Sequence, residues 1–131
     1  MVVWKEEFGI GIAAIDAQHQ KLFEITNKVY KLLNNDLLTD KYDQIVAVIE
    51  ELRNYTIEHF AAEEAYMQEI NYRKFLSHKA IHNDFIERIE GVDLSKIDNE
   101  QNLYLKEILN FVTDWLISHI LQTDKLITTA D

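Results

Sequence analysis

Apolar residues recur along this chain at alternating steps of four and three residues, the spacing of one face of an α-helix. The longest run comprises Ile45, Ile49, Leu52, Thr56, His59, Glu63, Tyr66 and Ile70. Three shorter runs repeat the spacing: His19, Leu22 or Phe23, Thr26, Val29 or Tyr30 and Leu33; Phe75, His78, His82, Phe85 and Ile89; and Leu105, Ile108, Val112, Trp115 and His119. The pattern therefore predicts four amphipathic helices that turn these faces inward.

Polar breaks separate the four runs. They are Asn34-Asn35-Asp36, Asn71-Tyr72 and the stretch from Gly91 to Asp98. The chain has no proline and three glycines, and two of these, Gly9 and Gly11, fall in an aromatic-bearing arm before the first helix. We expect an arm over residues 1–15 and helices over about 18–34, 41–70, 73–90 and 99–123.

The short link between the second and third helices forces them to be antiparallel neighbours, and the other links allow the same arrangement. With 131 residues, the chain can bury a core without disulfide bonds. We therefore expect an all-α protein with a single domain over residues 1–131. Its fold should be an up-down-up-down antiparallel four-helix bundle that carries an N-terminal arm.

Potential metal ligands interrupt the apolar seam. His59 precedes Glu63 by four residues, His78 precedes His82 by four, His119 precedes Asp124 by five, and His19 stands alone. Residues four apart on a helix lie about 5–6 Å from each other, so such a pair can reach one metal centre. Any single histidine could be an ordinary core or surface residue, but here all five histidines fall in register.

Seven donors exceed the four ligands of a structural zinc and suit two octahedral ions with bridging carboxylates. A buried Glu63 would also cost several kcal/mol unless a cation offset its charge. For Asp124 the five-residue spacing requires a distorted helix, with a π-turn or an unwound end near residues 121–123. The alternative is a solvated aspartate at a helix end. Three further glutamates flank the seam and are expected to face water without a chemical role: Glu58, Glu64 and Glu69.

Composition excludes several classes of protein. The absence of cysteine excludes disulfides, thiolate zinc sites and iron–sulfur clusters. A net charge of −10 disfavours nucleic acid and anionic membrane surfaces as partners. The N-terminus does not match a secretory signal, and Asp114 and His119 interrupt the most apolar stretch, residues 108–121. We therefore expect no membrane segment and a cytoplasmic location.

The seven donors match the complete ligand set of the hemerythrins, which this chain resembles over nearly its whole length. Its opening is also similar to that of the bacterial single-domain members, through Trp4, Phe8, Gly9, Gly11, Ile15-Asp16 and Gln18-His19. The resemblance implies two iron ions joined by an oxo or hydroxo bridge. His78, His82 and His119 would hold one iron, His19 and His59 the other, and Glu63 and Asp124 would bridge them. The second iron then keeps one open position, where dioxygen would bind.

The resemblance also implies an oxygen pocket lined by Leu22, Phe60, Trp115, Leu116 and Ile120. Core packing alone is the alternative role for these side chains. Because no acid or base stands out beside this pocket, we expect a reversible oxygen carrier for storage, delivery or sensing rather than an enzyme. A di-iron oxidase or peroxidase that consumes oxygen or peroxide is the alternative. Ferritin-like oxidases are disfavoured because their Glu-x-x-His pattern is missing, and the protein recipient of the oxygen is unknown.

Overall fold

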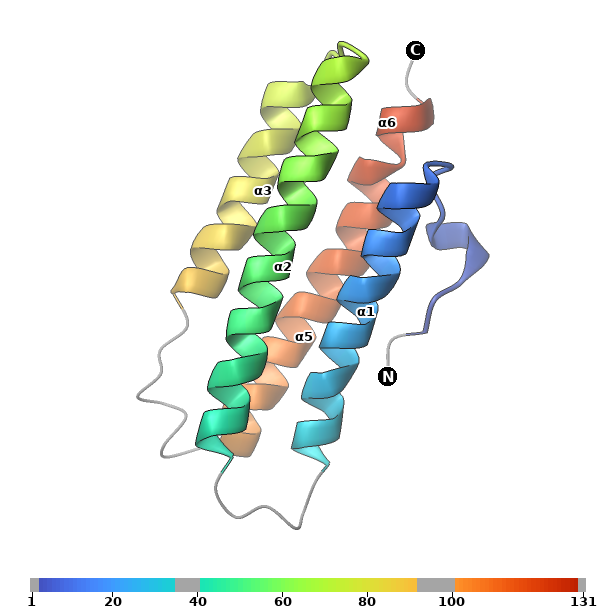
Figure 1. The fold of residues 1–131 in the computed structure, drawn as a ribbon. Helices are drawn as coiled ribbons and strands as arrows, with labels where there is room; N and C mark the ends of the chain where they lie inside the picture. The colour runs from blue at the N-terminus through green and yellow to red at the C-terminus, as the bar shows by residue number, and fades with distance from the viewer. Residues whose placement is uncertain (1–2, 35–40, 92–100, 130–131) are drawn as a thin grey trace.

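The computed structural model describes residues 3–34, 41–91 and 101–129, and it is a bundle of four long helices without strands in these ranges (Figure 1). The helices are α1 (Ala13–Leu33), α2 (Tyr42–Glu69), α3 (Phe75–Glu90) and α5 (Gln101–His119). Each runs antiparallel to the one before it, as the colour gradient shows (Figure 1). The predicted all-α, up-down-up-down bundle is therefore confirmed.

The first helix differs most from its expected bounds. It begins at Ala13 rather than near residue 18, because two alanines favour helix and Ile15 is already buried against the core. Both ends of α2 and of α3 lie within two residues of the expected positions. The expected breaks at residues 35–36 and 92–98 and the expected start of the last helix at residue 99 lie outside the described residues.

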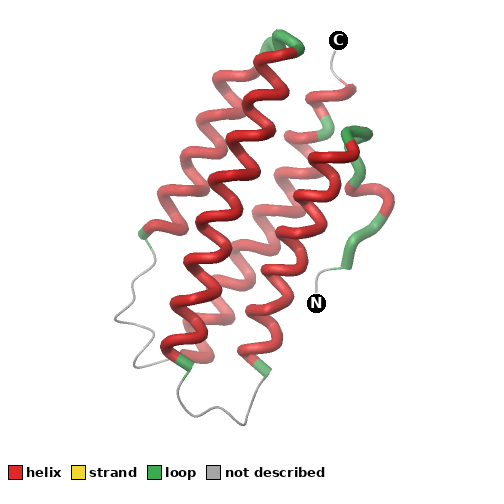
Figure 2. The backbone as a smooth tube through the Cα atoms, in the orientation of Figure 1, coloured by secondary structure: helices red, strands yellow, loops and turns green. Residues whose placement is uncertain are grey.

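A tight turn joins α2 to α3 and fixes their relative position (Figure 2). Asn71 adopts a φ of 57°, a conformation that asparagine tolerates better than most residues. This lets the Tyr72 N–H donate to Met67 O at 2.8 Å and the Asn71 N–H donate to Gln68 O at 3.1 Å. The two bonds satisfy carbonyls at the end of α2, so the chain reverses at once.

The N-terminal arm packs along α1 through three aromatic rings. Trp4, Phe8 and Phe23 have their ring centroids 5.4–5.7 Å apart in pairs. The Ile10 N–H donates to Asp16 Oδ1 at 2.9 Å, which ties the end of the arm to the first turns of α1. Between them Gly11 has a φ of +90°, where a side chain would be strained. The arm is thereby held against the helix.

The predicted seam of α2 is buried from Ile45 to Glu63 and then departs from expectation. Ile70 is 42% exposed, Tyr66 is half-buried and Met67 is fully buried. The prediction for Tyr66 and Ile70 is wrong because a four-residue step from Glu63 leads to Met67, and the helix ends at Glu69. In the described part of the chain, no helix is long and apolar enough to cross a membrane.

Candidate metal centre

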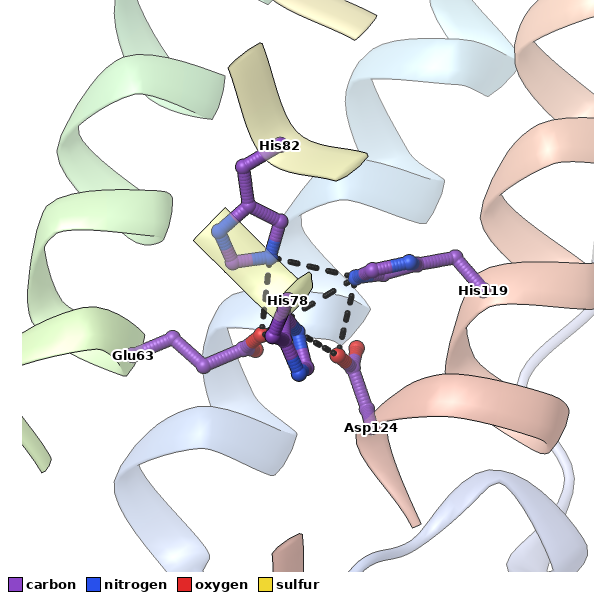
Figure 3. Close-up of side chains that lie close together, drawn as sticks. All are labelled: Glu63, His78, His82, His119 and Asp124. Atoms are coloured by element: carbon purple, nitrogen blue, oxygen red, sulfur yellow. Dashed lines mark hydrogen bonds and ion pairs between the residues drawn. The ribbon is translucent and has the colours of Figure 1, made fainter. Parts of the chain in front are cut away.

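Seven potential ligands, six from the four long helices and one from the turn that follows α5, meet in the half of the bundle that lies nearer the α2–α3 turn. Their exposed fractions lie between 0% and 5%: His19 on α1, His59 and Glu63 on α2, His78 and His82 on α3, His119 at the end of α5, and Asp124 beyond it. Figure 3 shows five of these side chains converging from three directions. All the residues that sequence analysis predicted as ligands are thus brought together.

A π-helical turn, η2 (Ile120–Asp124), continues α5 and is followed by the short α6 (Leu126–Thr129). The Lys125 N–H donates to Ile120 O at 3.2 Å, five residues back instead of four. The wider turn moves Asp124 inward, so that its Oδ1 lies 2.9 Å from His119 Nε2. The expected distortion is confirmed, and the alternative of a solvated Asp124 is wrong, since this residue is fully buried.

The seven residues form two overlapping groups whose potential ligand atoms lie within 4.8 Å of one another in each group. One group has three histidines and the other has two: His78, His82 and His119 in the first, and His19 and His59 in the second. Glu63 and Asp124 belong to both. We call them the three-histidine group and the two-histidine group.

Each shared carboxylate directs one oxygen to each group. Glu63 Oε1 lies 2.8 Å from His78 Nε2 and 3.0 Å from His82 Nε2, on the three-histidine side. Its Oε2 lies 3.2 Å from His59 Nε2 and 3.5 Å from His19 Nε2, on the other side. Asp124 divides in the same way, with Oδ1 3.0 Å from His78 Nε2 and Oδ2 3.0 Å from His19 Nε2.

Two side chains outside the seven residues contact ring nitrogens of the site and indicate the tautomers of these rings. His59 Nδ1 lies 2.6 Å from Gln18 Oε1, and His82 Nδ1 lies 3.0 Å from Glu64 Oε2. Amide and carboxylate oxygens only accept, so both rings carry hydrogen on Nδ1. In a neutral ring Nε2 then presents a lone pair, and on both histidines it faces an oxygen of Glu63. A cation between these atoms would remove the repulsion.

Without metal, protons would have to provide the positive charge. Burial lowers the pKa of His19 and of His78, but the adjacent carboxylates of Asp124 and Glu63 outweigh burial and raise both values to about 9. Burial raises the pKa of Asp124, as does the charge of Glu63, yet the histidines around it lower the value to about 2. For His59 burial prevails and lowers the pKa. The site is therefore built around ionised carboxylates that need cationic neighbours.

The donor set fits this need. Five imidazole nitrogens and two carboxylates are borderline and hard ligands that suit divalent iron, and the chain has no cysteine to favour softer metals. Several oxygens, namely Glu63 Oε2 and both of Asp124, accept no aligned hydrogen bond from any described residue. Coordination would satisfy these buried atoms, which are otherwise costly.

The five expected pocket residues surround the histidines unequally. Leu22, Leu116, Ile120 and Phe60 are buried and Trp115 is half-buried. Phe60 stacks on His82, with centroids 3.8 Å apart and planes inclined by 3°. Trp115 stacks on His119 at 4.3 Å and 15°. Both aromatic rings therefore fix histidines of the three-histidine group, in addition to packing the core.

Two residues that contact the site were not predicted from the sequence. Gln18 entered only as part of the family's opening motif, and Glu64 was expected to face water. The expectation for Glu64 is wrong, since its side chain is 18% exposed and contacts His82; Glu58 and Glu69 are indeed exposed. A usable signal was the four-residue step from Phe60 to Glu64, which places both side chains on the side of α2 that faces α3.

Comparison with known proteins identifies the family. Residues 10–130 match the family described as the hemerythrin HHE cation binding domain. The chain is 46% identical to a bacteriohemerythrin of Clostridium acetobutylicum over 125 residues, which cover 95% of this chain and 97% of that protein. It is 29% identical to a myohemerythrin of Theromyzon tessulatum, covering 92% of this chain and 86% of that one.

Solved structures agree with the sequence relatives. The crystal structure of a wild-type hemerythrin superposes with a TM-score of 0.80 at 30% sequence identity, covering 98% of this chain and 96% of that chain. A leucine-to-tyrosine mutant of hemerythrin gives a TM-score of 0.82 at 28% identity, covering 98% and 95%. The chain with this buried histidine and carboxylate cluster belongs to the hemerythrin family.

Proposed function

We propose that this protein binds dioxygen reversibly at two non-haem iron ions held by the seven buried donors. His78, His82 and His119 would ligate one iron, and His19 and His59 the other. Glu63 and Asp124 would bridge the two ions, together with an oxo or hydroxo group. Dioxygen is the expected ligand because the chain belongs to the hemerythrin family.

The observation that carries this proposal is the division of each carboxylate between the two groups. Glu63 directs Oε1 to the histidines of one group and Oε2 to those of the other, and Asp124 does the same with its two oxygens. A carboxylate that serves a single ion does not need this arrangement. Two bridging carboxylates also neutralise part of the charge of two metal ions, which the buried position requires.

The unequal number of histidines supports an open position for a small ligand. With shared carboxylates and one shared bridging group, the three-histidine group would supply six ligands to one iron, whereas the two-histidine group would supply five to the other. When bound, two ferrous ions supply the electron pair that dioxygen accepts on binding and gives back on release.

The residues of the chain then determine whether this exchange stays reversible. Leu22, Leu116 and Ile120 are buried apolar side chains at the expected pocket, where they would exclude water and external protons. Reversible binding requires such exclusion, because proton entry favours irreversible oxidation of the metal. Turnover of oxygen or peroxide would require a proton donor at the pocket, and these three side chains supply none. We therefore favour a carrier over an oxidase or peroxidase.

The test uses protein produced in iron-replete cells. We expect two irons per chain and a charge-transfer absorption of a bridged diferric centre after oxidation. The reduced protein, mixed with oxygen in a stopped-flow instrument, should form an oxygenated species that reverts when oxygen is removed under vacuum. One zinc per chain would contradict the metal assignment. Steady consumption of peroxide with added reductant, without a reversible oxygenated form, would replace the carrier by an enzyme.

A further inference from the structure

Two of the five histidines of the site form a hydrogen bond through Nδ1, while their Nε2 atoms contact Glu63. The partners are side chains that lie outside the seven-residue cluster. Gln18 Oε1 accepts from His59 Nδ1 at 2.6 Å, and Glu64 Oε2 accepts from His82 Nδ1 at 3.0 Å. The Nδ1 atoms of the other three histidines, His19, His78 and His119, are buried and make no hydrogen bond with any described residue. The chain thus supports one histidine in each group.

The two supporting side chains differ in charge. Gln18 presents a neutral amide oxygen to the two-histidine group, whereas Glu64 presents a carboxylate to the three-histidine group. The Glu64 side chain is only 18% exposed and His82 is fully buried, so water screens their interaction weakly. A carboxylate that accepts from the far nitrogen of an imidazole increases the electron density that the near nitrogen can donate to a metal.

The position of His82 strengthens this effect. Phe60 covers one face of its ring at 3.8 Å, and the ring nitrogens contact Glu64 on one side and Glu63 on the other. The imidazole therefore has little freedom to rotate away from either carboxylate. On the opposite side of the cluster, His59 has a similar anchor in Gln18 but receives no additional charge from it.

We propose that Glu64 and Gln18 make the two metal positions electronically unequal. Glu64 strengthens His82 as a donor, so the three-histidine position favours the ferric state, while Gln18 orients His59 and leaves the two-histidine position more electron-poor. The inference rests on the proposed di-iron function, and both residues act as positioning residues through a histidine. In a protein that holds one ferric and one ferrous ion, the ferric ion occupies the three-histidine position, next to Glu64 and His82.

Two complementary variants test the charge difference. Glu64→Gln removes the carboxylate behind His82, and Gln18→Glu adds one behind His59. Glu69→Gln is the matched control, because it removes the same charge from the same helix at an exposed position. Circular dichroism of each purified variant establishes that it is folded, and the opposite charge change of Gln18→Glu keeps the test decisive if Glu64→Gln does not fold.

The first readout is the midpoint potential for oxidation of the diferrous protein by one electron, which passes to an added outer-sphere oxidant such as ferricyanide. We expect Glu64→Gln to raise this potential by about 59 mV, which corresponds to a tenfold loss in preference for the ferric ion. Gln18→Glu should change the electron paramagnetic resonance signal of the mixed-valence form, because the ferric ion then has a comparable alternative position. Glu69→Gln should alter neither property.

The second readout needs no iron. Titration of the metal-free protein with cobalt(II) should show about tenfold weaker binding of one of the two ions in Glu64→Gln, and unchanged binding in Glu69→Gln. Equal potentials and equal cobalt affinities in the parent and Glu64→Gln would overturn the inference even if oxygen binding is reversible. If oxygen binding fails but the cobalt and potential shifts appear, the proposed function falls and the unequal metal positions stand.

Discussion

The two halves of the bundle use the same helices and the same seam register but very different side chains. Near the α2–α3 turn the seam holds five histidines and two carboxylates, all at most 5% exposed. In the other half the corresponding positions are aliphatic, including Val29, Ile45, Ile89 and Leu105, and are equally buried. The two halves are thus alike in burial and periodicity. Burial is favourable for the aliphatic side chains and unfavourable for the charged ones.

This difference indicates a division of tasks. The aliphatic half gains free energy from removing its side chains from water, at about 25 cal/mol per Å². The polar half must instead offset the desolvation of charged groups, which protons do only in part because burial opposes the protonation of every histidine whose pKa is shifted. Metal should therefore stabilise one half strongly and the other only through the shared helices.

Among the changes considered, removal of the metal should produce the largest difference in stability between the two halves. We expect the metal-free protein to melt about 10 °C or more below the iron-loaded form, since ligand binding adds its free energy to that of folding. Amide hydrogen exchange should show faster opening in the half with the histidines than in the aliphatic half. Equal melting temperatures for the two forms would mean that the seven residues do not bind metal in the folded protein.

Loss of a single histidine should disturb only the polar half. His82→Ala removes a donor of the three-histidine group, and we expect iron content to fall from two towards one per chain. Lys28→Ala is the control, because Lys28 pairs with Glu51 on the surface at 2.6 Å and should leave iron content unchanged. Iron analysis of both purified variants decides the matter, and two full equivalents in His82→Ala would exclude this residue as a ligand.

Truncation of a side chain in the aliphatic half should lower the free energy of unfolding by the same amount with and without metal. Ile45 is fully buried near the start of α2, and Ile45→Ala should lower the free energy of unfolding by about 2–5 kcal/mol through lost burial and a residual cavity. The loss should be the same with and without iron, as measured by urea denaturation. A loss confined to the iron-loaded form would show that the two halves are energetically inseparable.

How far the sequence predicts this molecule depends on the kind of interaction. The four-and-three spacing predicts the helices and the convergence of His59, Glu63, His78 and His82, because helical periodicity determines which side chains share a face. The five-residue step to Asp124 likewise predicts a distorted helix, and of its two forms, a π-turn or an unwound end, the structure has the π-turn. For Glu64 the spacing indicates only which side of α2 the residue occupies. Its contact with His82, like that of Gln18 with His59, depends on how far apart the helices pack and on the rotamers that reach across. The early start of α1 at Ala13 has no side-chain cap to announce it and depends on the burial of Ile15, which the helical spacing did not include.

The smallest expected change concerns the boundary between the two halves, where apolar side chains adjoin the histidines. Leu116 is 3% exposed and lies one turn before His119, in one hydrophobic cluster with Leu22, Phe60 and Ile120. If it shields the open metal position, Leu116→Ala should admit water and accelerate oxidation of the oxygenated protein to the diferric form about tenfold, which corresponds to roughly 1.4 kcal/mol in the barrier. Iron content and helicity should stay close to those of the parent.

Leu105→Ala provides the matched control, since it removes the same atoms from a buried position of the same helix in the aliphatic half. Autoxidation rates measured side by side separate the two roles: equal acceleration in both variants would mean that Leu116 only packs the core, whereas acceleration in Leu116→Ala alone supports a protective wall around the oxygen site.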